Sequence, residues 1–152
     1  MNERWKNLGL LLLRLAGLYL ALAHGWGKVQ SLAGGDTGFV SALGNMGFPL
    51  PGLFAWAAAL SEFLGGLLVA LGLFTRWAAA FGAFTMAVAA FGRHHLIGRL
   101  LHATGISVVS EDTLKAWGNA ELATMYLLIF LCLVMVGAGG FSLDAKFRKK
   151  GK

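Results

Sequence analysis

Two ionisable side chains lie inside apolar runs of the chain, and both need an explanation. Glu62 is the single charged residue between positions 53 and 74, and Arg14 lies within the first apolar run. An ionised side chain at membrane depth costs about 2.5–3.5 kcal/mol on insertion scales, so it is expected to face a bundle interior and to have a partner. The simplest interpretation is a buried Arg14–Glu62 ion pair that sets the register of two helices.

Small and polar residues follow one face of the first helix. At about 100° per residue, Gly17, His24 and Lys28 point to the same side as Arg14. A second small-residue face surrounds Glu62 on the next helix and comprises Ala58, Gly65, Gly66 and Val69. Such faces let two backbones approach closely. We expect the two faces to meet, with His24 and Lys28 on the outer side of Glu62.

These residues have the chemistry of a pocket for a small redox molecule. A quinone head group needs a proton donor and a proton acceptor inside an apolar cavity. Glu62, His24 and Lys28 are the candidate catalytic residues for that proton exchange. The candidate binding residues around them are Trp26, Phe48, Trp56, Phe63 and Arg14. In the alternative interpretation, Arg14 and Glu62 only hold the helices together.

A second polar cluster is expected near the outer ends of the third and fourth helices. It comprises His94, His95, His102 and Glu121. Histidine and carboxylate are ligands that zinc and iron accept. However, adjacent histidines do not form an HxxxH pair, and no ExxH spacing occurs within a helix. Interfacial hydrogen bonding or proton carriage is therefore preferred to a metal site.

The composition places these residues in a membrane protein. Hydrophobic residues make up 57% of the 152 residues and charged residues 13%, whereas soluble domains contain roughly 45–50% and about 25%. Many basic residues lie in the C-terminal segment KFRKKGK, which indicates a cytoplasmic membrane surface with anionic lipid and not a nucleic acid. The single cysteine, Cys132, excludes an intrachain disulfide and is expected to be a buried structural thiol.

Four apolar runs predict an all-α, integral membrane four-helix bundle made of one domain, residues 1–152. The runs span 8–25, 53–74, 77–92 and 122–140. Each is near the ~20 residues that cross a bilayer. The first outer connection should contain a short interfacial helix at 38–46 capped by Thr37. The second should be irregular or helical, with an apolar segment at 96–102 and a helical turn capped by Ser110.

The distribution of Lys and Arg predicts the orientation. Eight of these residues lie beside the helix ends on one side and four on the other, so the positive-inside rule places both termini in the cytoplasm. A cleaved signal peptide is an alternative for the first run, because ALA at 21–23 resembles a cleavage site. Arg14 in the core of that run argues against cleavage.

Three segments of the chain form a recognisable pattern. They are LLLRLAGLYLALAHGWGKVQ, MGFPLPGLFAWAAALSEFLGGLLVALGLFTRWAA and GNAELATMYLLIFLCLVMVGAGGFSLD. Their specific parts are Arg14, His24, Gly25 and Lys28, the SEFLGG glutamate, the GLFTR turn and the closing GAGGFSLD. In this order and spacing they resemble the DoxX family of small four-helix membrane proteins.

The resemblance implies an inner-membrane protein of a bacterium or archaeon that is associated with redox chemistry. Related DoxD-type subunits resemble parts of a thiosulfate:quinone oxidoreductase, and other members are linked to quinone or thiol homeostasis with soluble partner enzymes. The first hypothesis is therefore a redox subunit with a quinone-type pocket between the first and second helices, near the outer face, and with a redox partner protein. The alternatives are a non-catalytic membrane anchor for a partner enzyme and a carrier of a small molecule or proton, for which a homo-oligomer is expected.

Overall fold

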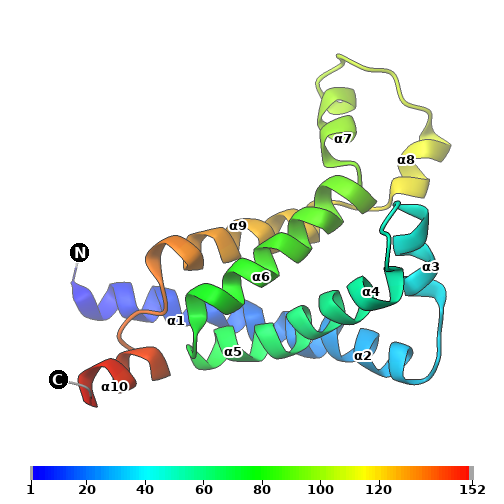
Figure 1. The fold of residues 1–152 in the computed structure, drawn as a ribbon. Helices are drawn as coiled ribbons and strands as arrows, with labels where there is room; N and C mark the ends of the chain where they lie inside the picture. The colour runs from blue at the N-terminus through cyan, green and yellow to red at the C-terminus, as the bar shows by residue number, and fades with distance from the viewer. Residues whose placement is uncertain (1, 151–152) are drawn as a thin grey trace.

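The described part of the chain, residues 2–150, consists of helices and the loops between them, with no strand, in this computed structural model (Figure 1). Within it, four long rods lie side by side, and η marks a π-helical segment. The rods are α1 (Glu3–Leu20), η1 (Ala21–Gly25) and α2 (Trp26–Ala33); α4 (Pro51–Leu60), η2 (Ser61–Gly65) and α5 (Gly66–Leu71); α6 (Thr75–Ala87) and η3 (Val88–Arg93); and α9 (Glu121–Val136). The shorter helices are α3 (Gly38–Asn45), α7 (Leu96–Ala103), α8 (Glu111–Trp117) and α10 (Leu143–Lys150). The predicted all-α class is confirmed.

The first and second rods pack through the small-residue faces that the sequence predicts. A Cβ atom built on Gly17 would lie 2.8 Å from the carbonyl oxygen of Gly66, and one on Gly25 would lie 2.5 Å from the backbone nitrogen of Phe63. Side chains cannot approach backbone atoms so closely, so glycine is required at both contacts. The two backbones therefore nearly touch, which leaves no room for a ligand ring between them at Gly25.

The third and fourth rods form the other half of the structure. Phe130 of α9 lies over Gly82 of α6, where a Cβ atom would come within 2.7 Å of the ring. The apolar core that joins the rods includes Leu20, Val69, Met86, Tyr126 and Leu133. The Phe130 ring packs directly on Gly82, which brings α6 and α9 close together. The core residues come from all four rods, so the core lies between them.

Two rods, Glu3–Ala33 and Pro51–Leu71, are long and apolar enough to cross a membrane. A third span results if α8 and α9, which meet at a bend of 46°, are taken together. The third rod is short, has arginines near both ends and is built from alanine more than leucine. Large apolar side chains also face outward along the rods. The chain is thus a helical membrane protein. Of the four predicted crossings, length and composition support two, or three if the bent pair counts as one span.

The first connection contains the expected short helix, α3, and its apolar residues Phe39 and Leu43 pack toward α2 and α4. The predicted capping residue is wrong. Thr37 occupies the cap position, but its side chain makes no capping hydrogen bond. Instead, Asp36 Oδ1 accepts the Gly38 N–H at 2.8 Å. A carboxylate is the stronger acceptor and interacts favourably with a helix N-terminus, which explains the difference.

The second connection forms an arm that projects from one end of the rods (Figure 1). This α7–α8 arm covers residues 96–117 and contains the two predicted elements. Ser110 caps α8 as expected, its Oγ accepting the Thr113 N–H at 3.3 Å. Arg99 Nη2 donates to the carbonyl oxygens of Leu114 and Gly118, which ties α7 to α8. The end that carries α3 and this arm is called the α3 end below.

The opposite end, called the α10 end, is closed by the segment that leads into α10. The Asp144 N–H donates to the Gly72 carbonyl oxygen at 2.8 Å. The Asp144 carboxylate accepts the N–H groups of Phe74 at 2.8 Å and Thr75 at 3.0 Å. Phe74, the residue before α6, has a φ of 47° and so adopts the left-handed backbone conformation. The GLFTR turn and the closing GGFSLD segment thus form one structural unit.

Arg14 belongs to the α10 end, and the predicted Arg14–Glu62 ion pair is wrong. Its Nη2 donates to the Phe141 carbonyl oxygen, and its Nη1 lies against Gly72, where any Cβ atom would clash. Gly72 is ten residues beyond Glu62, about 15 Å along the helix. Helical side chains lean toward the N-terminus of their own helix, which carries Arg14 away from Glu62.

Candidate functional site

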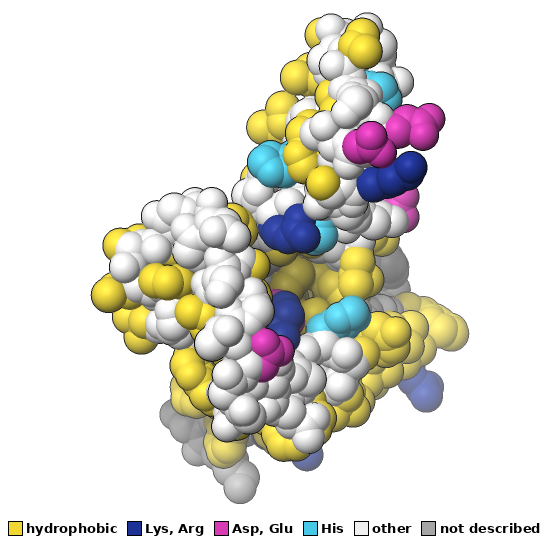
Figure 2. Space-filling model, turned by 90° about the vertical axis from the view of Figure 1, so that its right-hand side faces the viewer, with side chains coloured by type: hydrophobic (Ala, Val, Ile, Leu, Met, Phe, Trp, Pro, Cys, Tyr) yellow, Lys and Arg dark blue, Asp and Glu magenta, His cyan; other side chains and the backbone are white. Residues whose placement is uncertain are grey.

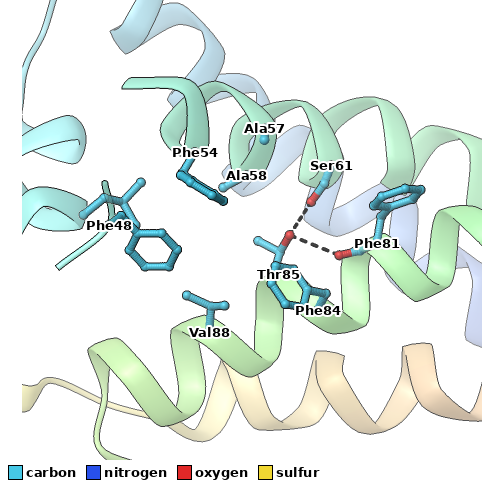
Figure 3. A pocket seen from close by; sticks show the side chains of 10 residues that line it. Phe48, Phe54, Ala57, Ala58, Ser61, Phe81, Phe84, Thr85 and Val88 are labelled. Atoms are coloured by element: carbon cyan, nitrogen blue, oxygen red, sulfur yellow. Dashed lines mark hydrogen bonds between the residues drawn. The ribbon is translucent and has the colours of Figure 1, made fainter. Parts of the chain in front are cut away.

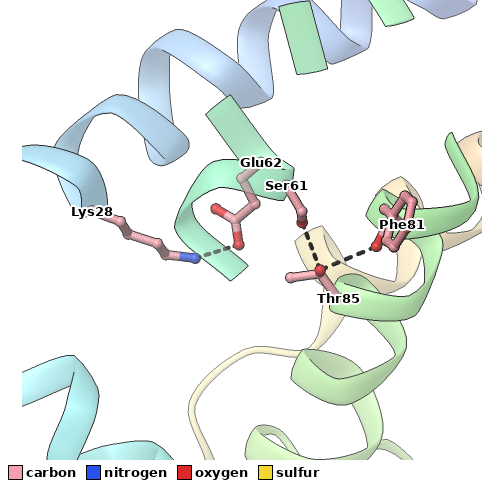
Figure 4. Close-up of polar contacts among 5 residues, drawn as sticks. All are labelled: Lys28, Ser61, Glu62, Phe81 and Thr85. Carbon is pink, nitrogen blue, oxygen red and sulfur yellow. Dashed lines mark hydrogen bonds and ion pairs between the residues drawn. The ribbon is translucent and has the colours of Figure 1, made fainter. Parts of the chain in front are cut away.

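Lys28 and Glu62 form an ion pair near the α3 end (Figure 4). Lys28 Nζ lies 2.5 Å from Glu62 Oε1. The Glu62 side chain is 2% exposed and the Lys28 side chain is 35% exposed. Lys28 therefore provides the partner that was expected from Arg14, and it does so from the α3 side of Glu62, where the sequence placed it.

Two π-helical turns position this pair. Glu62 lies inside η2, and Lys28 follows η1 by three residues. Gly25 of η1 is in near contact with the backbone of η2, so the two widened turns face each other. Such turns often occur at functional sites. A π-helical turn changes the angular position of every later residue around the helix axis. A projection at a constant 100° per residue does not include this change, and no residue type in η1 or η2 predicts it.

The pair leaves one carboxylate oxygen unused. Glu62 Oε2 is buried and has no hydrogen-bond partner among the described residues. The Lys28 ammonium is 5.2 Å from the centre of the Phe39 ring, a cation–π distance. A buried oxygen without a donor is destabilising. Glu62 Oε2 is therefore a receptive position for a ligand hydroxyl or a water, and the pair has the groups needed for proton exchange.

A hollow at the α3 end opens above an apolar floor (Figure 2). A basic side chain lies within it, and histidine and further basic side chains stand at its margin. The partial exposure of Lys28 agrees with an opening on this side of the molecule. Solvent can thus reach the Lys28 side of the ion pair at the α3 end.

An apolar cavity of about 200 Å³ adjoins the same helical turn, between the second and third rods (Figure 3). Its walls are Leu43, Phe48, Phe54, Ala57, Ala58, Ser61, Phe81, Phe84, Thr85 and Val88. Ser61 faces this cavity, whereas the next residue, Glu62, faces Lys28 (Figures 3 and 4). The pocket was expected between the first and second rods. It lies on the other side of η2 because the Gly25 contact closes the first gap.

The polar groups of this cavity are two hydroxyls. Thr85 Oγ1 donates to the Phe81 carbonyl oxygen at 3.1 Å, a bond that helical threonine often makes to the preceding turn. Ser61 Oγ lies 2.6 Å from Thr85 Oγ1. Because the Thr85 hydrogen is committed to Phe81, Ser61 donates to Thr85. Only acceptor lone pairs remain free, so the cavity favours a guest that brings its own donor.

The other predicted site residues surround the ion pair unevenly. Trp26 and Phe63 contact each other, with ring centroids 5.1 Å apart. His24 packs edge-on against Tyr19, with ring centroids 6.2 Å apart. Trp56 is partly exposed and does not line the apolar cavity. The structure thus pairs Trp26 with Phe63 beside the two facing turns, places His24 in η1 against Tyr19, and leaves Trp56 outside the apolar cavity.

Sequence reasoning missed three residues of the site. Phe39 approaches Lys28 from α3, and Phe54 and Thr85 line the cavity. One signal was available for Thr85, because it is a hydroxyl residue in the middle of the third apolar run. No local pattern indicates the other two, since their roles depend on how α3 and α4 meet.

The histidines of the second connection hold the arm in place. His94 Nδ1 is 2.8 Å from the Trp117 carbonyl oxygen, and the His95 ring stacks on Trp117 with centroids 4.8 Å apart. His102 bonds to the backbone of its own loop, and Glu121 accepts a hydrogen bond from the Asn119 side chain. Across residues 2–150, no three His, Cys, Asp or Glu side chains are placed to hold a metal ion.

Comparison with known proteins gives the family. The DoxX family model matches residues 9–95. An uncharacterized protein of Haemophilus influenzae is 34% identical over 148 residues, which covers 97% of each chain. "Inner membrane protein YphA" of Escherichia coli is 30% identical over 138 residues, 90% of this chain and 89% of that one. "Putative oxidoreductase CatD" of Bacillus subtilis is 32% identical over 154 aligned positions, 100% of this chain and 95% of that one. No solved structure matches. The chain therefore belongs to the DoxX family.

Proposed function

We propose that this DoxX-family membrane protein is a subunit of a redox system and binds a quinone-type molecule at the α3 end. The observation that carries the proposal is the buried Lys28–Glu62 pair beside an apolar cavity with two hydroxyls. Apolar walls with a few convergent polar groups are typical of small-molecule sites. Family membership and the oxidoreductase in the name of the related CatD support the redox class.

The cavity favours the reduced form of such a molecule. An apolar protein cavity of about 150 Å³ holds benzene, so about 200 Å³ accommodates one substituted ring. The free lone pairs of Ser61 accept a hydrogen bond from a ring hydroxyl but offer nothing to a carbonyl. A hydroquinone should therefore bind more tightly than its quinone.

Each residue of the site has a role in this proposal. Ser61 holds a ring hydroxyl in the cavity, and Glu62, which faces the other side of η2, receives through water a proton that the hydroquinone releases on oxidation. Lys28 stabilises the ionised carboxylate before Glu62 takes up this proton and again after Glu62 passes it to the hollow. Oxidation of a hydroquinone releases two protons and two electrons. The protons leave past Glu62 through the hollow, and the electrons pass to a partner redox protein, which is the oxidant.

A binding titration tests this assignment. By isothermal titration in detergent, the wild-type protein should bind a small hydroquinone, and Ser61→Ala should weaken binding about tenfold because one buried hydrogen bond is lost. Ser41→Ala on the exposed side of α3 is the matched control. Glu62→Gln should retain binding, because Glu62 does not line the cavity, and should slow the oxidation of the bound hydroquinone by an added artificial electron acceptor. Equal binding by wild type and Ser61→Ala would refute the site.

We further propose that all four rods cross the inner membrane, with both termini in the cytoplasm and the α3 end outside. The excess of basic residues at the α10 end supports this orientation, as do the names of the inner membrane proteins YphA and YqjF. In a Cys132→Ser background, Ser110→Cys should react with an impermeant maleimide in intact cells, and Phe147→Cys only after lysis. The reverse pattern would overturn the orientation.

A non-catalytic anchor for a partner redox enzyme is the second candidate, and the α7–α8 arm favours it. Ile97, Ile106 and Val108 are large apolar residues that the arm leaves exposed, and clustered exposed apolar residues mark interaction surfaces. In that case Lys28–Glu62 only sets the helix register. Capture of the partner enzyme would then be lost in Ile106→Asp and unchanged in Glu62→Gln, and no hydroquinone binding would be measured.

A further inference from the structure

A polar cavity of about 560 Å³ lies at the α10 end, far from the candidate redox site. Its walls come from the start of α1, the start of α6, the loop at 137–140 and α10. Three of its lining residues are basic, namely Lys6, Arg76 and Arg148. Nothing in the proposed redox chemistry uses this cavity, so its charges need a separate account.

The acidic residues of the cavity make no salt bridge with its arginines. Both oxygens of Asp144 accept backbone N–H groups at the start of α6. Glu3 lies 3.9 Å from Lys6 and is itself exposed. Among residues 2–148, whose side chains the structure describes, neither Arg76 nor Arg148 has an ion-pair partner. The cavity therefore presents two guanidinium groups without a salt-bridge contact, and its three basic side chains outnumber its two acidic ones.

The walls around these arginines are held in place. Arg76 Nη2 donates to the Met135 carbonyl oxygen at 3.2 Å, which fixes the guanidinium at the edge of the cavity. Gly137, with a φ of +83°, lies beside it, and a Cβ atom there would come within 3.3 Å of Nε. The Gly140 N–H donates to Asn7 Oδ1 at 2.7 Å, which anchors the loop on α1. The Arg76 guanidinium is thus held in place by its contacts, and its remaining N–H groups are available to a ligand.

The position of the cavity indicates the kind of anion. Trp5 and Trp77 flank this end and are 66% and 71% exposed, as expected for rings at a membrane–water interface. The cavity consequently lies at the level of lipid headgroups, where basic pockets between helices recognise anionic lipid. Arginine is suited to a phosphate because its planar fork donates two parallel hydrogen bonds.

We propose that this cavity binds the phosphate of an anionic phospholipid, held between Arg76 and Arg148. The lipid acyl chains would then extend along the apolar outer faces of the rods. This assignment does not depend on the redox proposal, because the two sites share no residue.

Native mass spectrometry with defined lipids tests the proposal. Protein exchanged into phosphatidylglycerol should retain one lipid through delipidating detergent, whereas protein in phosphatidylcholine should not. Arg148→Gln and Arg76→Gln should each weaken retention about tenfold. Lys115→Gln removes an exposed charge at the α3 end and is the matched control. Arg76→Lys keeps the charge without the fork and should give an intermediate value, which separates recognition from misfolding.

Three outcomes would overturn the assignment. The first is equal retention of both lipids, and the second is equal retention by the wild type and both Gln variants. The third is complete displacement of phosphatidylglycerol by millimolar inorganic phosphate, with phosphate bound in its place, which would identify a soluble phosphate ligand. Retention of phosphatidylglycerol in millimolar phosphate supports the lipid.

Discussion

The two ends of the molecule each bury an ionised side chain in the same pair of rods, and they treat it differently. At the α10 end, Arg14 is 1% exposed and its guanidinium is enclosed by Phe141 and Gly72. At the α3 end, Glu62 is equally buried, but its partner Lys28 remains partly exposed and one carboxylate oxygen stays free. The first arrangement encloses the charged group, whereas the second leaves the lysine of the pair in contact with solvent.

The difference follows from the chemistry of the partners. Arg14 donates through Nη2 to a backbone carbonyl, which cannot change its protonation state, and its Nε and Nη1 are buried without a hydrogen-bond partner among the described residues. Glu62 accepts through one oxygen from an ammonium on a flexible stem, and both groups of that pair can gain or lose a proton. A site that moves protons needs two groups that can exchange a proton and a path to solvent, whereas a contact that only joins helices needs neither of these. Three sets of substitutions and one pH titration test this contrast.

Replacing Gly25 should have the largest effect, because the α3 end depends on the contact between the two π-turns. In Gly25→Ala the new Cβ would lie 2.5 Å from the Phe63 backbone, so the rods must separate. We expect a loss of about 2–3 kcal/mol in the free energy of unfolding, measured by SDS titration. Gly27→Ala is the matched control, since nothing lies within 4 Å of its Cβ position. Equal stability of the two variants would contradict the close contact.

Replacing Asp144 should weaken the α10 end without affecting the α3 end. Asp144→Ala removes the acceptor of the Phe74 and Thr75 N–H groups at the start of α6. We expect a loss of about 1–2 kcal/mol, as for other lost helix caps. Asp112→Ala, on an exposed part of α8, is the control. Hydroquinone binding by Asp144→Ala should equal that of the wild type, and a parallel loss of binding would show that the two ends are not independent.

Breaking the ion pair should have a moderate effect on stability and should remove proton exchange without removing hydroquinone binding. Lys28→Met leaves the buried Glu62 carboxylate without its partner, but Lys28 is 35% exposed and water partly replaces it. We therefore expect a loss of about 1–2 kcal/mol, below the value for a fully buried pair. Lys28→Met combined with Glu62→Leu should recover this stability and show no proton uptake. A combined variant less stable than Lys28→Met alone would refute this account.

The smallest effect is expected from pH at the cap of α3. Hydrogen bonds from Ser31 and from the Gly38 N–H lower the pKa of Asp36 below its ordinary value of 3.8. A lowered pKa in the folded state means that the ionised carboxylate stabilises α3 at pH values above 3.8. This contribution should disappear as the pH falls through the folded pKa. Thermal melts between pH 2.5 and 6 should show this loss in the wild type and not in Asp36→Asn.

Several parts of the fold could be predicted because their causes are local. The small-residue faces of the first two helices, the helix at 38–46 and the Ser110 cap all depend on residues within one or two turns. The burial of Arg14 and Glu62 was also predictable, because a charged residue in an apolar run has to face inward. These features could therefore be read from the local sequence alone.

The candidate site itself could be predicted only in part. Glu62 and Lys28 were identified, but the cavity wall formed by Phe54 and Thr85 was not. The cavity arises where α4 and α6 diverge beyond the Ser61–Thr85 hydrogen bond, and that divergence has no local signature. The choice of Asp36 over Thr37 as the cap was likewise decided by how the connection enters α3.

The sequence by itself determined that two buried charges would face the interior of an all-helical membrane protein. The tertiary structure alone decided which group each charge would meet. Arg14 leans toward the α10 end and finds a carbonyl, while the π-turns rotate Lys28 over Glu62. The reason is that periodicity assigns a residue to a face, whereas its partner depends on the height and angle of a different helix, which only long-range packing sets.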